Sequence, residues 1–342
     1  MKQEKTIDLL AKKANISKHI LKCDKCNNES IISLEYGPHN FCKNHFNKFF
    51  KARFKKTIRK YSLFKSKEKL LIAVSGGKDS ILALNLLHEF YSKSNPMQVL
   101  IVDEGVNGYR NNAIKLTIDT CKKFKIKCNV ISFREKFNIT NDELMPILLN
   151  NPKLGGTCAF CGTIRRNIMN SFAKEINADK IVTGHNLDDE VQSFVMNVFN
   201  NEIDRIIKSS VQQKKVKNIS FVKRIKPLYE TPEKEIIAYC EFNKIKHYSQ
   251  DGCPYSWTAK RNEYRKMLNQ FEIKFPGTGH SILRFNENLN KILKNNENEI
   301  NIFNKKIKEC KICDEPTQKE FCKTCEMIQK IKNEKTKLEK IV

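Results

Sequence analysis

The chain has 342 residues, enough for one large domain with small modules or for two domains with a sizeable core. Its formal net charge of +25 favours a polyanionic partner, nucleic acid before an anionic membrane surface, although a lysine-rich genome composition would give the same excess. No apolar run reaches the length of a membrane-spanning helix, and charges interrupt residues 1–20, so we predict a cytoplasmic protein with no membrane partner.

Two sets of four metal-ligand residues lie near the two ends of the chain. In a reducing compartment, thirteen cysteines indicate metal binding or catalysis more than disulfides. Each set consists of two ligand pairs with two residues between the partners, which is typical of a closed tetrahedral zinc site that supports folding and RNA docking. Chance clustering is the alternative. The sets are Cys23, Cys26, Cys42 and His45, and Cys310, Cys313, Cys322 and Cys325.

A basic segment follows the first set. Residues 43–69 contain eleven Lys or Arg and one acid, interleaved with aromatic residues. The lysines suit contact with RNA phosphates, whereas we expect Phe49 and Phe50 to pack on the zinc module or the catalytic domain. A second basic segment, residues 205–226, has eight Lys or Arg and no acid and is predicted to be a mobile loop.

Strands and helices alternate between about residues 69 and 275. We predict strands at residues 70–74, 99–102, 128–133 and 180–183 and helices at 80–91, 109–124, after 162, 188–200, 230–240 and 259–271. This alternation predicts an α/β fold with a doubly wound parallel sheet and a site at the carboxyl ends of its strands. The predicted organisation is an extension (1–22), an N-terminal zinc module with a basic helix (23–66), a catalytic domain (67–285) and a basic helix with a zinc ribbon (286–342).

The segment Ser75-Gly76-Gly77-Lys78-Asp79-Ser80 lies between an apolar strand and a helix start. Two glycines let the backbone approach a polyanion, and the amides of the helix N-terminus point at it. The Walker spacing is absent. The segment resembles the PP-loop of ATP pyrophosphatases, which split ATP into AMP and pyrophosphate, whereas an ordinary strand-to-helix turn is the alternative.

Further polar residues follow neighbouring strands. Asp103 and Glu104 end the second strand, and the fourth ends in Gly184, which permits close approach of a nucleotide. Asp189 is a candidate for magnesium binding or acid–base work, and Asp188 would cap the helix that follows.

Six cysteines lie outside the two terminal sets. Three of them, Cys121, Cys128 and Cys240, are predicted to be small core residues. Cys158 and Cys161 lie in a glycine-rich loop before a basic helix that contains Arg165, and these cationic neighbours favour a lowered thiol pKa. Cys253 lies on another loop, and spacing does not show whether it joins the pair.

Several motifs occur in one order: the PP-loop, Gly-Thr-Cys-x2-Cys-Gly-x2-Arg-Arg (156–166), Gly-His-Asn-Leu-Asp-Asp-Glu (184–190), Pro227-Leu228 before a Glu-rich helix, and Cys253-Pro-Tyr. In these motifs the chain resembles the tRNA 2-thiolation enzymes of the TtcA/TtuA family and the wobble-uridine thiolases of archaea and eukaryotes. The terminal zinc modules match the uridine-acting branch. The thymidine-loop enzymes carry Lys at the position of Arg165, whereas Arg–Arg is more typical of the wobble-uridine branch. The resemblance covers about residues 23–325.

This resemblance implies an ATP-dependent sulfurtransferase that adenylates the C2 oxygen of a uridine in tRNA and replaces it with sulfur. Implied cofactors are ATP, Mg²⁺, two Zn²⁺ and a [4Fe–4S] cluster, with a [3Fe–4S] form or a persulfide as alternatives. The sulfur donor would be sulfide or a thiocarboxylated ubiquitin-like protein, and the oligomeric state stays open, with a homodimer as one option. A cytidine 2-thiolase and a non-catalytic zinc-ribbon RNA-binding protein are the competing functions.

The resemblance also assigns site residues. The cluster ligands would be Cys158, Cys161 and Cys253, and the catalytic set adds Asp79, Arg165 and Asp189. The nucleotide site would comprise Ala73, Ser75, Gly76, Gly77, Lys78, Asp79, Ser80, Val102, Arg165, Gly184 and Asp189.

Overall fold

A computed structural model of the chain describes residues 21–37, 39–208, 221–249, 252–295 and 307–339. It contains two compact units, one ending at Ala52 and the other beginning at Arg53, with the boundary inside helix α2 (Lys43–Lys60). Residues 53–66, which we grouped with the N-terminal module, therefore lie in the larger unit, as does the C-terminal module. The predicted extension over residues 1–22 lies almost wholly outside the described residues.

The smaller unit contains an antiparallel pair, β1 (Ile32–Leu34) and β2 (His39–Phe41), followed by the first part of α2. Aromatic rings hold the helix to the hairpin within this unit. The Phe49 ring lies 5.1 Å from that of Phe41, and Phe46 and Phe50 are 5.9 Å apart and buried. Phe50 is buried and Phe49 is half-buried against Phe41, which agrees with the expectation that these rings pack on the protein.

The larger unit is built on a five-stranded parallel sheet in the order β5-β4-β3-β6-β7, which confirms the predicted fold class. The strand order reverses between β3 and β6, so the carboxyl ends of these two strands form the crevice where ligands bind in such folds. The strands are β3 (Leu70–Ala73), β4 (Met97–Asp103), β5 (Lys127–Ser132), β6 (Lys180–Thr183) and β7 (Lys223–Ile225).

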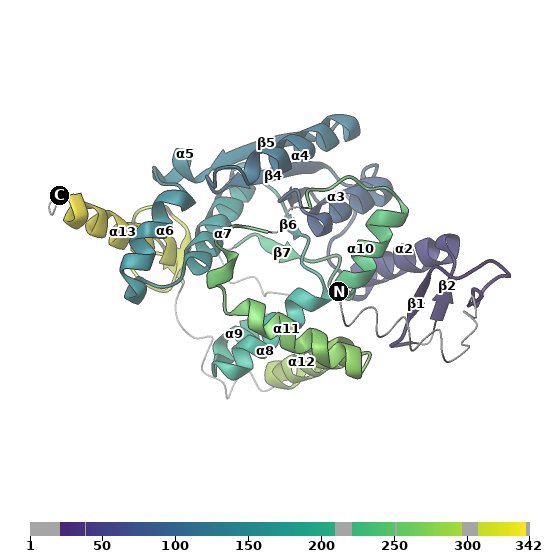
Figure 1. The fold of residues 1–342 in the computed structure, drawn as a ribbon. Coiled ribbons are helices and arrows are strands. Elements are labelled where there is room, and N and C mark those ends of the chain that lie inside the picture. The colour runs from purple at the N-terminus through teal and green to yellow at the C-terminus, as the bar shows by residue number, and fades with distance from the viewer. Residues whose placement is uncertain (1–20, 38, 209–220, 250–251, 296–306, 340–342) are drawn as a thin grey trace. The chain divides into compact units, whose positions relative to one another are not determined.

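Helices cover the sheet (Figure 1). Among them, α4 packs on β4 and β5, whereas α7 packs on β4 and β6, and right-handed crossovers place such helices on opposite faces. The larger unit also contains two short 3₁₀ turns, η1 (Pro152–Leu154) and η2 (Ser256–Thr258). The helices are α3 (Lys78–Tyr91), α4 (Arg110–Phe124), α5 (Phe133–Phe137), α6 (Asn141–Asn150), α7 (Thr157–Glu175), α8 (Leu187–Phe199), α9 (Ile203–Lys208), α10 (Glu233–Phe242), α11 (Arg261–Lys274), α12 (Thr278–Asn295) and α13 (Lys323–Glu339).

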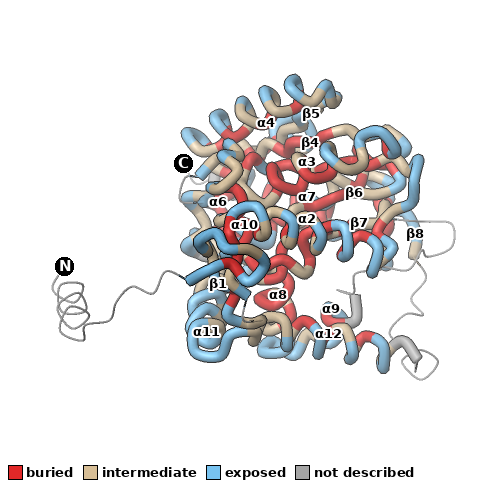
Figure 2. Tube along the Cα trace, turned by 90° about the vertical axis from the view of Figure 1, so that its right-hand side faces the viewer, coloured by how far each residue is buried: buried red, intermediate tan, exposed pale blue. Residues whose placement is uncertain are grey.

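One large core cluster lies between the sheet, α6 and α7, and buried residues are concentrated along β3, β4 and β6 and in α3 and α7 (Figure 2). Leu71 and Leu100 of the sheet meet Phe160 of α7, and Met327 and Ile331 of α13 belong to the same cluster. The C-terminal helix is thus part of the core of the larger unit.

Three local expectations were wrong or incomplete. We expected α7 to begin after Gly162, but it begins at Thr157, because Gly156 adopts the extended conformation of a helix N-cap and the residues after it favour the helix. The short strand β7 was not predicted, since two of its three residues are charged. The basic loop predicted over residues 205–226 was too long: residues 205–208 belong to α9 and residues 223–225 form β7, while residues 209–220 lie outside the described residues.

Within the segments that the structure describes, no helix combines the length and apolarity needed to cross a membrane.

Candidate functional site

The PP-loop leaves β3 at the point where the strand order reverses. Its serines close the loop: the Ser75 amide donates to Ser80 Oγ at 3.1 Å, and Ser80 Oγ donates to the Gly77 carbonyl at 3.0 Å. Gly76 has φ +88°, and a Cβ there would lie 2.7 Å from Ala113 Cβ, so only glycine fits. No side chain caps α3, which leaves the amides of its first turn available to an anion.

Gly184 at the end of β6 has a packing role of its own. A Cβ on this residue would lie 2.7 Å from the amide nitrogen of Ser80. We expected Gly184 to admit a nucleotide, and the structure shows that it already admits the PP-loop backbone. A side chain here would therefore displace the phosphate loop even with no ligand bound.

Charged side chains surround the loop. Lys78 Nζ lies 2.5 Å from Glu233 Oε1 of α10 and 3.2 Å from Asp79 Oδ2. Asn186 Nδ2 donates to Asp79 Oδ1 at 3.0 Å. Burial raises the pKa of Asp79, and the Lys78 ammonium and the Asn186 amide offset part of that rise. The sequence analysis did not single out Glu233. The only signal for it was the Glu-rich helix predicted after Pro227-Leu228.

Asp189 lies at the start of α8, beside the PP-loop. Its backbone amide donates to Asn186 Oδ1 at 3.0 Å in a capping box, and its carboxylate lies 3.4 Å from Arg261. We expected Asp188 to cap α8, which was wrong. Asn186 occupies the cap because its extended backbone directs its amide to the helix, while Asp188 accepts from the Glu233 amide at 2.7 Å.

The structure brings the three central cysteines to one neighbourhood. Cys158 and Cys161 lie in the first turns of α7, and Cys253 lies in the loop shortly before η2, which packs against α7. Their thiols interact electrostatically. Burial raises the pKa of Cys161 to about 12, and the opposing effect of Arg165 is smaller, so the expected lowering is outweighed. The three sulfurs do not form one of the described ligand sets within 4.8 Å.

Arginines gather next to these cysteines. Burial lowers the pKa of Arg166 to about 10, and the like charges of Arg224, Arg165 and Arg205 lower it further. Like charges lower the pKa of a cation only when they lie near it, so this part of the site carries concentrated positive charge. Such a concentration suits an anionic ligand.

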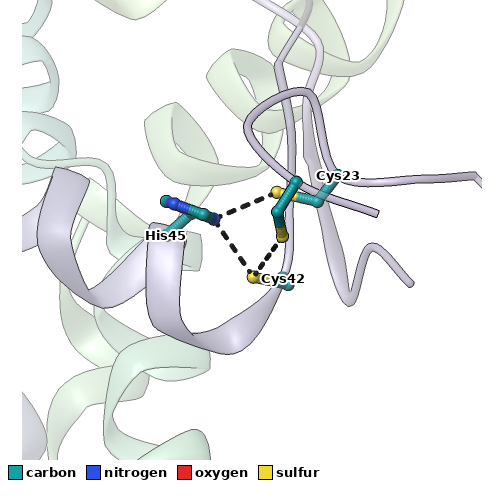
Figure 3. Close-up of side chains that lie close together, drawn as sticks. Cys23, Cys42 and His45 are labelled. Atoms are coloured by element: carbon teal, nitrogen blue, oxygen red, sulfur yellow. Dashed lines mark hydrogen bonds between the residues drawn. The ribbon is translucent and has the colours of Figure 1, made fainter. Parts of the chain in front are cut away.

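The predicted N-terminal metal ligands lie together in the smaller unit (Figure 3). Cys23 Sγ and Cys42 Sγ are each 3.4 Å from His45 Nδ1, and the sulfurs of Cys26 and Cys42 are 3.7 Å apart. Tetrahedral zinc with Zn–S near 2.3 Å and Zn–N near 2.05 Å requires about 3.8 Å between sulfurs and about 3.6 Å between sulfur and nitrogen. The observed distances agree with both values.

The C-terminal ligands form the same arrangement from four sulfurs. Cys313 Sγ lies 3.6 Å from Cys322 Sγ and 3.5 Å from Cys325 Sγ, and all four ligand atoms lie within 4.8 Å of one another. The hairpin of β8 (Lys308–Glu309) and β9 (Pro316–Thr317) and the start of α13 supply them. Of the site residues predicted from spacing, these eight are thus the ones that the structure gathers most closely.

Comparison with known proteins places the chain in a family. Residues 46–272 match the PP-loop domain family. The chain is 35% identical to a probable sulfurtransferase of Methanocaldococcus jannaschii, covering 92% of this chain and 89% of the relative, and 31% identical to the tRNA-5-methyluridine(54) 2-sulfurtransferase of Pyrococcus horikoshii, covering 89% and 93%.

A solved structure agrees with these relatives. The U34-tRNA thiolase NcsA from Methanococcus maripaludis, solved with its [4Fe–4S] cluster, matches with a TM-score of 0.75 and 30% identity, covering 92% of this chain and 97% of that one. The family model, the relatives and the solved structure agree, so the chain belongs to the PP-loop family of tRNA 2-thiolation enzymes.

Proposed function

We propose that this chain is an ATP-dependent tRNA 2-thiouridine synthetase that forms AMP and pyrophosphate. The observation that carries the proposal is the position of an intact PP-loop at the reversal point of the sheet, in the same unit as three mutually interacting cysteines. The uracil C2 oxygen attacks the α-phosphate of ATP and pyrophosphate leaves. Hydrosulfide then attacks C2, and AMP departs with the original oxygen, so that no oxidant or reductant is needed.

ATP would bind with its phosphates on residues 75–80, where the uncapped amides of α3 meet the polyanion. Lys78 supplies positive charge, and Asp79 and Asp189 are the proposed magnesium carboxylates, since Mg²⁺ prefers oxygen ligands. Arg165 offsets negative charge that develops at the α-phosphate. The strand-end residues Ala73, Val102 and Gly184 line the proposed nucleotide site.

The donor set fits an iron–sulfur cluster. Cys158, Cys161 and Cys253 supply three thiols, which neighbour one another without forming a single-ion site. Thiolates that ligate different irons of a cluster stand farther apart than thiolates on one ion. A [4Fe–4S] cluster held by these three thiolates would leave one iron without a protein ligand, and that iron would be the place for the sulfur to bind. A [3Fe–4S] form and a persulfide on one cysteine are the alternative chemistries.

We assign one Zn²⁺ to each terminal module. The ligand distances match tetrahedral coordination, and four protein ligands leave no open position. These ions would hold their modules folded and take no part in the chemistry.

Arg166, Arg205 and Arg224 are the proposed contacts for RNA phosphates beside the cysteines, because phosphate contacts supply much of the affinity for a nucleic acid. Two basic residues of α2 have a different role: Arg53 and Lys60 pair with Glu235 and Glu230 in the same unit.

Three further properties remain predictions. They are the location in the cytoplasm, the sulfur donor (sulfide or a thiocarboxylated ubiquitin-like protein) and the assembly into a homodimer. The names of the relatives specify positions 34 and 54, so the thiolated position stays open.

Asp79→Ala tests the proposal. We expect it to abolish tRNA-dependent AMP formation, by at least about 100-fold, while tRNA affinity stays within about threefold, because the loop and the proposed RNA surface are separate. An ATP-turnover assay and filter binding measure the two effects. Equal loss of both would mean that the substitution unfolds the unit.

Mass spectrometry of tRNA nucleosides from a deletion strain separates the competing functions. Loss of 2-thiouridine supports the proposal, loss of 2-thiocytidine supports a cytidine 2-thiolase, and unchanged nucleosides support a non-catalytic RNA-binding protein.

A further inference from the structure

One buried carboxylate, that of Glu104, lies between two arginines at the end of β4. Its Oε2 lies 2.7 Å from Arg110 Nε, and its Oε1 lies 3.5 Å from Arg165 Nη1. The Glu104 side chain is only 8% exposed, and its backbone carbonyl accepts a hydrogen bond from the Asn141 amide at 2.7 Å. The carboxylate is therefore fixed by its own backbone as well as by its partners.

Arg110 continues this connection to the phosphate loop. Its Nη1 donates to the carbonyl of Ser75 at 2.9 Å, and its Nη2 donates to the carbonyl of Val102 at 2.6 Å. The first of these carbonyls begins the PP-loop and the second lies near the end of β4. Arg110 is 5% exposed, so a rigid, buried guanidinium joins both strand ends.

The other arginine has a different environment. The Arg165 side chain is 46% exposed and extends from α7, the helix that carries Cys158 and Cys161. A long side chain in such a position retains many rotamers unless a fixed partner selects one of them. Glu104 is that partner, and Arg110 neutralises enough of its charge to let a carboxylate remain buried.

We propose that Glu104 is a positioning residue, which holds the Arg165 guanidinium on the helix of the cysteine pair and connects it through Arg110 to the phosphate loop. The proposal rests on the role of Arg165 in the proposed function and extends it to a residue that touches neither ATP nor a thiol. A guanidinium displaced by about 1 Å from a developing charge costs up to about 100-fold in rate. Loss of the carboxylate should therefore reduce turnover more than substrate binding.

The test uses the full-length chain with three single variants. Glu104→Gln removes the charge at nearly constant volume, and Glu104→Asp retains it on a shorter side chain. Glu235→Gln is the matched control, because Glu235 is fully buried and pairs with Arg53 at 2.9 Å on another part of the same unit. Both Gln variants leave a mostly buried arginine without its carboxylate, so general destabilisation affects both.

A double-mutant cycle with Arg165→Met gives the decisive kinetic readout. For tRNA-dependent AMP formation, we expect Glu104→Gln to lower kcat by about 10- to 100-fold with the KM for ATP within about threefold. Glu104→Asp should recover part of the loss, and Glu235→Gln should stay near wild type. The double variant should be no more than about twofold slower than Arg165→Met alone, since Glu104 acts through Arg165. Multiplicative losses, or an equal loss in Glu235→Gln, would overturn the proposal.

A second readout does not depend on the reaction. Nitrogen-15 relaxation of the Arg165 guanidinium, assigned by its absence in Arg165→Lys, should show an ordered group in the wild type and in Glu235→Gln and a mobile one in Glu104→Gln. Equal order in all three overturns the positioning role even where AMP formation is slow. A wild-type enzyme that forms no AMP with any tRNA would refute the proposed function instead, and the relaxation result would still decide the role of Glu104.

Discussion

In the terminal modules, four ligand atoms already lie within 4.8 Å of one another, whereas the sulfurs of Cys158, Cys161 and Cys253 form no such set among the described residues. The modules draw their ligands from hairpins and adjoining helix starts, and the central cysteines come from the first turns of α7 and a distant loop. Short local motifs thus produce closed single-ion geometry. The sheet, by contrast, brings three cysteines from distant segments to one neighbourhood without forming a single-ion set, as the proposed cluster site requires.

The terminal modules also differ from each other. The N-terminal ligands belong to the unit that ends at Ala52, whereas the C-terminal module shares a core with α6 and α7 (Figure 1). Glu315 accepts a hydrogen bond from Asn170 Nδ2 of α7 at 2.5 Å, and both residues are buried. A metal ion bound in the C-terminal module would therefore stabilise the helix that carries two of the central cysteines.

The largest expected effect is a loss of thiolation, and it distinguishes the three central cysteines from the closed ligand sets of the terminal modules. Cys253→Ala should reduce tRNA thiolation by more than about 100-fold, because a three-thiolate site loses a ligand, while AMP formation and zinc content stay near wild type. Cys240→Ala is the control, since Cys240 is buried in α10 away from the trio and should retain both activities. Thiolation at the normal rate in the Cys253 variant would make a persulfide on Cys158 or Cys161 the better mechanism.

A smaller effect distinguishes the two modules. Cys310→Ser should lower the melting temperature of the larger unit by roughly 5 °C or more, because loss of the metal would loosen α13, whose Met327 and Ile331 belong to the core cluster between the sheet, α6 and α7. Cys23→Ser should leave that transition within about 1 °C, since its ligand set lies in the smaller unit. Differential scanning calorimetry measures both. Equal shifts of the melting temperature in the two variants would contradict the expected difference between the modules.

The smallest effect concerns the contact between the C-terminal module and α7. Glu315→Gln keeps an acceptor for Asn170 but loses the charge, which should cost about 1–2 kcal/mol and lower the melting temperature by a few degrees with zinc content unchanged. Glu320→Gln, which removes an exposed partner of Lys311 in the same module, should change nothing measurable. If the two variants melt alike, the buried contact does not stabilise the unit.

Local signals explain what could be predicted from the sequence. The ligand pairs place two side chains in one turn, and the PP-loop needs only a strand, a glycine turn and a helix, so neither depends on distant residues. Contacts that depend on the order of the strands in the sheet could not be predicted from the sequence. The Lys78–Glu233 pair and the Glu104 bridge to Arg110 and Arg165 join residues that only the order of the parallel strands brings together.

The predicted start of α7 and the predicted cap of α8 were wrong for a related reason. The glycines before Cys158 indicated a loop that continued through Gly162, but Gly155 and Gly156 alone end the preceding turn, and the helix starts at Thr157. Asp188 and Asn186 are both good helix caps by residue type, and only the backbone conformation of Asn186 decides between them.

Metal analysis of protein prepared without oxygen and then exposed to air tests the contrast between closed and open sites most directly. We predict two zinc ions per chain before and after exposure, because closed zinc sites do not change redox state. Iron and acid-labile sulfide should be present only before exposure, and thiolation should stop with their loss while tRNA-dependent AMP formation persists. Iron that remains bound after Cys253→Ala, or a zinc content near zero in the anaerobic protein, would contradict the assignment of the three sites.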